Sequence, residues 1–270
     1  IPNVISITND GALYTSGEVL GISGGGTGAS INIDDVGSGP ITQIFVDSVG
    51  SGYEIGDDII FTNTDTGGGS AQAKVSLVNG GIVAEEGTSD MTEGEDHLIL
   101  EDETQRGDPF TGNKIVQESG SGSGDITDIR IINGGNNFRS LPTATVSTDN
   151  DGSGATIKLF GPEIGRVQSL KIVESGAEHQ QSPSPPTLSM RSKLIVTGIS
   201  GTFDTSDTIT GISDDGSTTV SGTFVSLDSD RGLMTLSDVT GNFGSGVTIT
   251  GSESEATATV RAGSLATATT

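Results

Sequence analysis

The sequence predicts an all-β chain made of tandem small β modules, barrel-like or sandwich-like, each about 40 residues long. Apolar or β-branched residues alternate with polar ones at a period of two, as in Ile129-Arg130-Ile131, which is typical of strands with one buried face. The same residues also recur at fixed offsets, which indicates stacked copies of one supersecondary element. A β-solenoid is the alternative arrangement of such copies.

The first repeat family combines a strand, a glycine turn, an aromatic residue and a closing segment similar to Gly-Ser-Gly-Ala-Thr. Tyr14 and Tyr53 occupy the same position in the first two copies, 39 residues apart, and Phe138 occupies it 85 residues later. The fourth copy is offset by 41 residues, carries His179 at this position and runs into a Pro-rich stretch without a closing segment. The sequence therefore predicts a degenerate fourth module.

A second repeat family follows, in which Phe203 and Phe243 stand 40 residues apart, each before an Ile-Thr-Gly run. In both families the glycines supply the positive φ of tight turns. The aromatic residue is interpreted as a core plug, because a small β module gains most of its core from one large apolar side chain. The predicted plugs are Tyr14, Tyr53, Phe138, Phe203 and Phe243.

These offsets divide the chain into six segments. They are two glycine-aromatic modules at 1–81, an acidic inserted β-hairpin segment at 82–125, the third and degenerate fourth modules at 126–181, a Pro/Ser-rich linker at 182–191, the second repeat pair at 192–262 and a tail at 263–270.

The inserted segment carries the densest charge of the chain, with twelve acidic and two basic residues between positions 82 and 125. Two short strand-like runs within it, at 97–101 and 114–118, predict a hairpin that projects from the array. We expect its apolar residues to form a subunit contact, although a solvated loop is the usual interpretation of a charge-rich segment. The expected contact residues are Leu98, Ile99, Leu100, Ile115 and Val116.

Composition narrows the possible functions. The formal net charge of −24 disfavours nucleic-acid binding, since phosphate contacts would be repulsive. The absence of Cys excludes disulfides, thiolate metal sites and a Cys nucleophile, and no apolar run reaches the ~18 residues that span a bilayer. With 42 glycines and 31% hydrophobic residues, stability is expected from many shallow contacts between modules or between subunits.

Acidic turns are the remaining candidates for site chemistry. Asp149, Asp151, Asp228 and Asp230 could offer oxygen ligands to Ca²⁺, yet none lies in an EF-hand-like ligand spacing. Asp and Gly are also the residues that tight turns require, so turn formation is the favoured interpretation. The sequence predicts no catalytic residue, no bound cofactor and no enzyme activity.

The glycine-aromatic modules with their closing segment, the Gly-x-Phe…Ile-Thr-Gly units and the run at 97–102 resemble virion structural proteins of tailed bacteriophages, notably T4-like phages of marine cyanobacteria. The resemblance covers most of the chain. It implies a non-enzymatic, homo-oligomeric component of a tail, baseplate, fibre or capsid surface, whose partners are copies of itself and other virion proteins, without nucleic acid, membrane or cofactor. A secreted bacterial filament subunit or a surface-adhesion module at the cell surface is the alternative.

Overall fold

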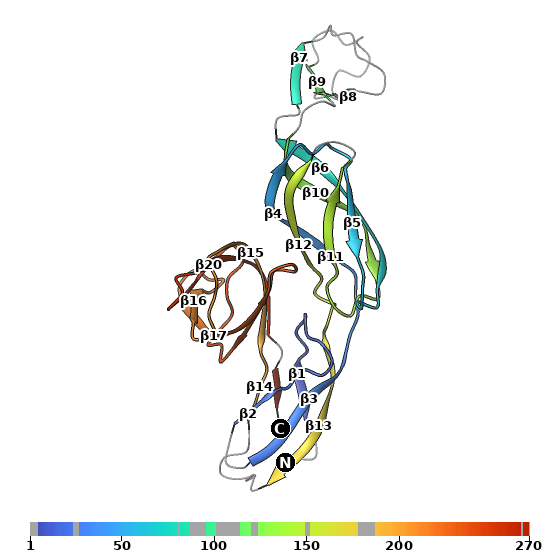
Figure 1. The fold of residues 1–270 in the computed structure, drawn as a ribbon. Coiled ribbons are helices and arrows are strands. Elements are labelled where there is room, and N and C mark those ends of the chain that lie inside the picture. Colours follow the sequence, from blue (N-terminus) through green and yellow to red (C-terminus); the bar gives the residue numbers. More distant parts are fainter. Residues whose placement is uncertain are drawn as a thin grey trace.

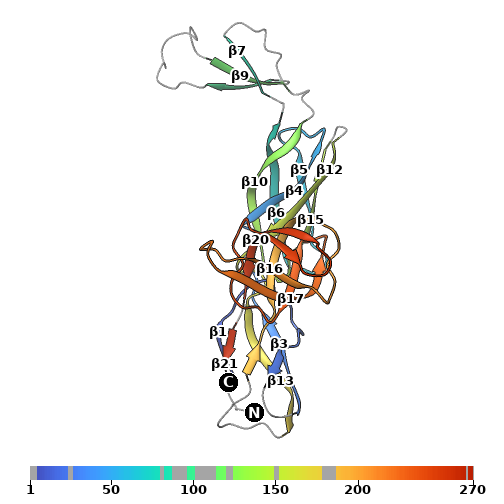
Figure 2. The same cartoon turned by 90° about the vertical axis from the view of Figure 1, so that its left-hand side faces the viewer.

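The computed structural model describes residues 5–23, 27–79, 82–86, 96–100, 114–119, 124–148, 152–177, 187–265 and 267–269. Within these residues the chain forms strands and turns and no helix, which confirms the predicted all-β class. Figures 1 and 2 show an elongated body: a small sheet at one end, two β units in line behind it, and a closed barrel beside the place where these two units meet.

The second and third modules interlock in one unit, which we call the distal unit. The second module comprises β4 (Gln43–Ser51), β5 (Asp58–Thr62) and β6 (Gly69–Asn79), and the third comprises β10 (Asp125–Asn136), β11 (Thr143–Ser147) and β12 (Ser153–Phe160). Each opening strand pairs with the closing strand of the other module, β4 with β12 and β10 with β6. The middle strands β5 and β11 pair with each other. The two modules therefore share one core and are not separate small barrels.

The first and fourth modules form a second unit by the same scheme, the proximal unit. Its strands are β1 (Ser6–Asn9), β2 (Gly21–Ser23), β3 (Thr27–Val36), β13 (Val167–Ala177), β14 (Thr187–Ser189) and β21 (Thr267–Thr269). Here β3 pairs with β13, β2 with β14 and β1 with β21. The ladder between β13 and β3 has the same register as the ladder between β10 and β6: the pair Val167↔Val36 corresponds to Ile126↔Val78. The three bulges of the two ladders also lie at equivalent positions. The register thus follows the sequence repeat.

The closed barrel holds the second repeat family. Its strands are β15 (Ser192–Ser200), β16 (Thr208–Ile212), β17 (Thr219–Asp228), β18 (Leu233–Ser237), β19 (Thr248–Gly251) and β20 (Thr257–Ser264), in the order β15-β18-β17-β16-β19-β20. Opening strand again pairs with closing strand, β15 with β20 and β18 with β17, and the middle strands pair with each other. Its apolar core includes Phe203, Phe224 and Phe243.

Both repeat families use the same turn after the aromatic plug. The backbone N–H that follows the aromatic residue donates to an acidic side chain three residues further on: Glu54 to Asp57 at 3.0 Å, and Asp204 to Asp207 at 2.7 Å. In each case an aliphatic residue six positions after the plug, Ile59 or Ile209, is buried. The two families are therefore versions of one three-stranded module, which sequence comparison alone did not reveal.

The inserted segment contributes a separate three-stranded sheet. Its strands are β7 (Ile82–Glu86), β8 (Asp96–Leu100) and β9 (Lys114–Ser119), in the order β7-β9-β8. The two strand-like runs pair antiparallel, and β7, which the sequence did not single out, pairs with the other edge of β9. In Figure 1 this sheet lies beyond the distal unit, at the end far from β1 and β21.

Two segment boundaries differ from the sequence interpretation. The Pro/Ser-rich stretch contains β14, and the residues interpreted as a tail contain β21, which is paired with β1. The closing strand of the fourth module is thus present, but the complete barrel stands between it and the rest of its module. The sequence 263–267, Gly-Ser-Leu-Ala-Thr, matches the closing segment Gly-Ser-Gly-Ala-Thr at 152–156.

Candidate assembly surfaces

A common apolar core joins the three units. Ile195 of the barrel is fully buried, in one cluster with Leu13 of the first module and Phe138 of the third. The segment that leads from the third module to the fourth adds Ile164 to this cluster. Because a close-packed protein core is hardly compressible, this core holds the barrel firmly against the other two units.

Buried polar contacts fix the same joint. Lys158 on β12 is 6% exposed, and its ammonium donates to the carbonyl oxygens of Ser229 at 2.6 Å and Asp230 at 3.2 Å, both in a barrel loop. Asp47 on β4 accepts from the N–H of Gly198 in the barrel at 2.6 Å and lies 3.6 Å from Lys158 Nζ. The distal unit therefore holds the barrel from two strands.

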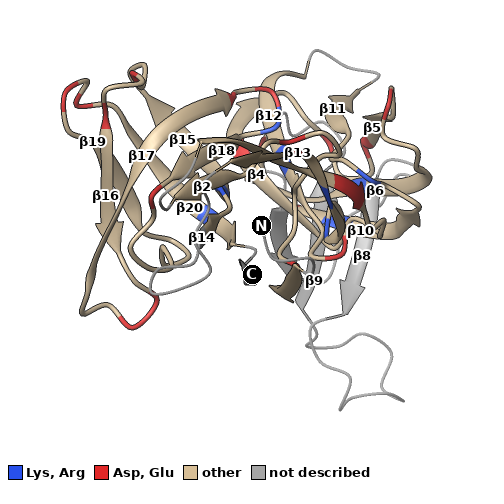
Figure 3. Cartoon of the chain, turned by 90° about the horizontal axis from the view of Figure 1, so that it is seen from below, with Lys and Arg blue, Asp and Glu red and all other residues tan. Residues whose placement is uncertain are grey.

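The proximal unit holds the barrel from the other side. Lys193 Nζ on β15 lies 3.0 Å from Glu18 Oε1 and 5.6 Å from the centre of the Tyr14 ring. The Tyr14 hydroxyl donates to the carbonyl oxygen of Arg191 at 2.7 Å. Lys158 and Lys193, two of the 12 basic residues of the chain, thus lie at joints between units. Hydrogen bonds from a charged donor are stronger than those between neutral groups, so each cation fixes its joint. Figure 3 shows acidic residues on several outer loops.

The distal unit exposes aliphatic side chains on its sheet surface. Ile60 and Ile132 are each 49% exposed and line one shallow depression of about 490 Å³ between β5 and β6. Asp58, Gln72 and Lys74 also line it. Asn63 belongs to the same lining, and its buried Oδ1 has no hydrogen-bond partner. Aliphatic residues surrounded by polar ones are a common feature of protein contact sites.

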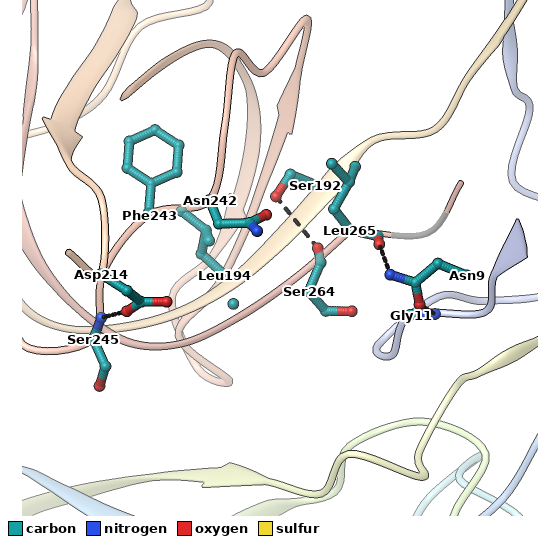
Figure 4. Close-up of a pocket in the computed structure, with 11 residues that line it drawn as sticks. Asn9, Gly11, Ser192, Leu194, Asp214, Asn242, Phe243, Ser245, Ser264 and Leu265 are labelled. Carbon is teal, nitrogen blue, oxygen red and sulfur yellow. Dashed lines mark hydrogen bonds between the residues drawn. The ribbon is translucent and has the colours of Figure 1, made fainter. Parts of the chain in front are cut away.

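A second, polar pocket of about 320 Å³ lies where the barrel meets β1 (Figure 4). Its walls come from the proximal unit through Asn9 and Gly11, and from the barrel through Asp214 and Asn242. The segment between β20 and β21, with Ser264 and Leu265, forms the remaining side. In Figure 4 the Asn9 side chain donates to the carbonyl oxygen of Leu265, at 3.1 Å.

The five predicted core plugs are all buried. Tyr14 lies in the proximal core, Tyr53 in the distal core, and Phe138 at the joint between units. Phe203 and Phe243 lie in the barrel core, where the Phe203 ring stacks on Phe224 with centroids 5.6 Å apart.

The other predicted site residues are only partly described. The expected contact residues Leu98, Ile99 and Leu100 lie on β8, and Ile115 and Val116 on β9, but their side chains lie outside the described residues. Among the calcium candidates, Asp149 and Asp151 also lie outside them. The Asp228 carboxylate is engaged by Arg231, whose Nη1 lies 2.8 Å from it. The backbone carbonyl oxygen of Asp230 accepts from Lys158 Nζ at 3.2 Å.

Sequence reasoning missed the residues that hold the units together, Lys158 and Ile195, and the role of 263–269. Only the last had a detectable signal, the repeat of the closing segment. Within the described ranges, no group of three or more His, Asp or Glu residues is placed to hold a metal ion, and no helix is long and apolar enough to cross a membrane.

Comparison with known proteins gives no match. No protein-family model matches the chain, and neither curated proteins nor solved structures include a significant relative.

Proposed function

We propose that this protein is a non-enzymatic structural component of a tailed-bacteriophage virion, in the tail, baseplate, a fibre or the capsid surface. It would act through β contacts with copies of itself and with other virion proteins. The observation that carries the proposal is the repetition of one module in three units that share the same scheme of strand pairing, opening strand with closing strand and middle strand with middle strand. A shared core at Phe138 and Ile195 locks these units together. This arrangement makes a stiff, elongated body from repetitive sequence.

Surface properties support an assembly role. The depression with Ile60 and Ile132 offers an apolar contact on the distal unit, and the acidic three-stranded sheet lies at the end of the body. The net charge of −24 keeps free subunits apart in solution, and added salt weakens this repulsion over a screening length of about 10 Å or less. Binding to partners would then have to come from shape and strand pairing more than from charge.

The direct test is to locate the protein. Antibodies raised against the recombinant chain are used on density-gradient fractions of a producing culture, together with quantitative mass spectrometry. We expect a fixed number of copies per DNA-filled particle. Recovery with cell-surface fibres and absence from particles would contradict the virion proposal and favour the bacterial filament or adhesion module.

A second experiment tests the inserted segment as a contact. Residues 84–122 are deleted and the ends joined, and the matched control substitutes only exposed residues of the closed barrel, such as Thr210→Ala and Thr250→Ala. We expect the deletion variant to keep the unfolding transition of the three units but to be lost from assembled particles. Incorporation at normal stoichiometry would show that the segment is a solvated loop.

A further inference from the structure

We propose that the ladder between β1 and β21 is a strand-exchange site, at which two copies of this chain join by each placing its β21 beside the β1 of the other. This inference rests on the proposed function, because it names the self-association through which an assembly protein would act. The occupant of the site is a second copy of the same chain.

The register identifies β21 as a separated part of its module. In the distal unit, β12 pairs with β4 through Thr156↔Ser48 and Ile157↔Val46, with a bulge between them. In the proximal unit, the equivalent pairs are Thr267↔Asn9 and Ala268↔Ile7, again with a bulge between them.

Neighbouring contacts repeat as well. Ser153 pairs with Ser51 in the distal unit, and at the equivalent place the Ala12 N–H donates to Ser264 Oγ at 2.5 Å. Strand β21 is therefore the closing strand that the fourth module requires, and not an added contact.

The attachment of β21 to the rest of the chain is slight. The six strands of the barrel close without it, and only residues 265 and 266 separate β20 from β21. The described ladder holds three residue pairs, whereas the ladder of β12 with β4 holds seven. A short ladder at the end of a complete domain opens at lower cost than the strands of a core.

Release of β21 would leave a specific vacancy. Among the strands that the structure describes, β1 pairs with β21 only, so the backbone N–H and C=O groups that form this ladder would lose their partners. Such an open edge accepts another strand, and the β21 of a second copy restores the same contacts. Exchange of an identical element gains and loses the same interactions, so its equilibrium is set mainly by protein concentration and by the connecting segment.

The connecting segment has room to change direction. Ser264 and Leu265 face the polar pocket of Figure 4 and do not lie within an apolar cluster. Three hydrogen bonds that involve side chains hold it there: from Asn9 to the Leu265 carbonyl oxygen, from the Ala12 N–H to Ser264 Oγ, and from the Ser192 hydroxyl to the Ser264 carbonyl oxygen. Ser264 is the last residue of β20 and pairs with Lys193 of its own barrel, so it stays in place when β21 is released. The bond from Asn9 to the Leu265 carbonyl oxygen lies beyond β20 and would form equally well with the segment of a second copy.

The test uses the absence of cysteine in the chain. Two single variants are made, Ser6→Cys and Thr269→Cys, whose Cα positions are direct partners in the ladder. They are mixed at high concentration, incubated and oxidised. A disulfide between position 6 of one chain and position 269 of the other can form in register only if the strand has been exchanged. Peptide mapping by mass spectrometry identifies this bond among other disulfides.

The matched control is a mixture of Thr210→Cys and Thr250→Cys, whose residues are exposed partners within the closed barrel. We expect at least a tenfold excess of the 6–269 cross-link over the 210–250 cross-link, and its yield should rise with protein concentration. Equal yields in the two mixtures would overturn the exchange proposal. The virion proposal would stand or fall separately, on recovery of the protein in particles.

Discussion

Lys158 Nζ lies 2.6 Å from the carbonyl oxygen of Ser229, although Lys158 is on the closing strand of the third module and Ser229 is in a loop of the barrel. The same ammonium lies 3.6 Å from Asp47 Oδ2 of the second module. One buried cation thus connects three modules that are far apart in the chain. The orientation of the barrel depends on such contacts as well as on apolar packing.

Replacement of Lys158 by Met should weaken this joint. The substitution keeps the length of the side chain but removes two hydrogen bonds from a charged donor and leaves Asp47 without its cation. We expect a loss of about 2 kcal/mol in the free energy of unfolding, measured by urea titration. Lys171→Met, at an exposed position, is the control and should change stability by less than about 0.5 kcal/mol. Similar effects at the two sites would show that Lys158 does not support the joint.

The plug at the joint should matter more than any surface residue. Phe138 is fully buried among residues of several modules, so Phe138→Ala leaves a cavity in their common core. We expect a destabilisation of about 3 kcal/mol or more. Thr62→Ala, at an exposed position on β5, should be nearly silent. If thermal unfolding midpoints of both variants shifted equally, the interpretation of the aromatic residue as a plug would be wrong.

Two glycines with positive φ should differ in their tolerance of alanine. Gly135 has φ of 70°, and an added Cβ would lie 2.5 Å from the Gly69 carbonyl oxygen and 2.7 Å from the Phe138 ring. Gly56 has φ of 98°, but a Cβ there would meet no atom within 4 Å. We expect Gly56→Ala to cost about 1–2 kcal/mol from backbone strain alone and Gly135→Ala clearly more, in the same urea titration. Equal costs would mean that the close approach relaxes freely.

The barrel should lose stability in acid. Burial by itself would raise the pKa of Asp207, but hydrogen bonds from the Ser254 hydroxyl and from the N–H groups of Asp204, Ser254 and Glu253 outweigh burial and hold the pKa well below its usual range. Hydrogen bonds from the Ser213 hydroxyl and from Ser217 lower the pKa of Asp215 to about 2. The ionised forms of both carboxyl groups are therefore stabilised by these hydrogen bonds in the folded state and not in the unfolded state.

The sign of the pH effect follows from these directions. A lowered pKa gives stability that is fully present above the unfolded value of about 3.9 and is lost as the pH falls towards the folded value. We expect the urea midpoint of barrel unfolding to stay constant from neutral pH to about pH 5 and to fall between about pH 4 and pH 2. Asp207→Asn should lower the midpoint at neutral pH and flatten the acidic decline. An unchanged slope in that variant would contradict the role of Asp207.

Much of this protein was determined by the sequence alone. Alternation at a period of two predicts the all-β class, because the side chains of a strand point to opposite faces whatever the strand pairs with. The plugs Tyr14, Tyr53 and Phe138 could be predicted for a similar reason, since a small module has few large apolar residues to bury. These properties are local to one module of about 40 residues, so each copy displays them independently.

Only the tertiary structure decided which copy pairs with which. All copies carry similar strand patterns, so periodicity cannot distinguish a pairing of the first module with the second from its actual pairing with the fourth. Asn9 and Leu265 form a hydrogen bond although they lie 256 positions apart in the sequence. The entropic cost of closing a loop grows only slowly with its length, so distance along the chain does not indicate which modules pair. The same reason concealed β21, whose module is interrupted by a barrel that closes by itself.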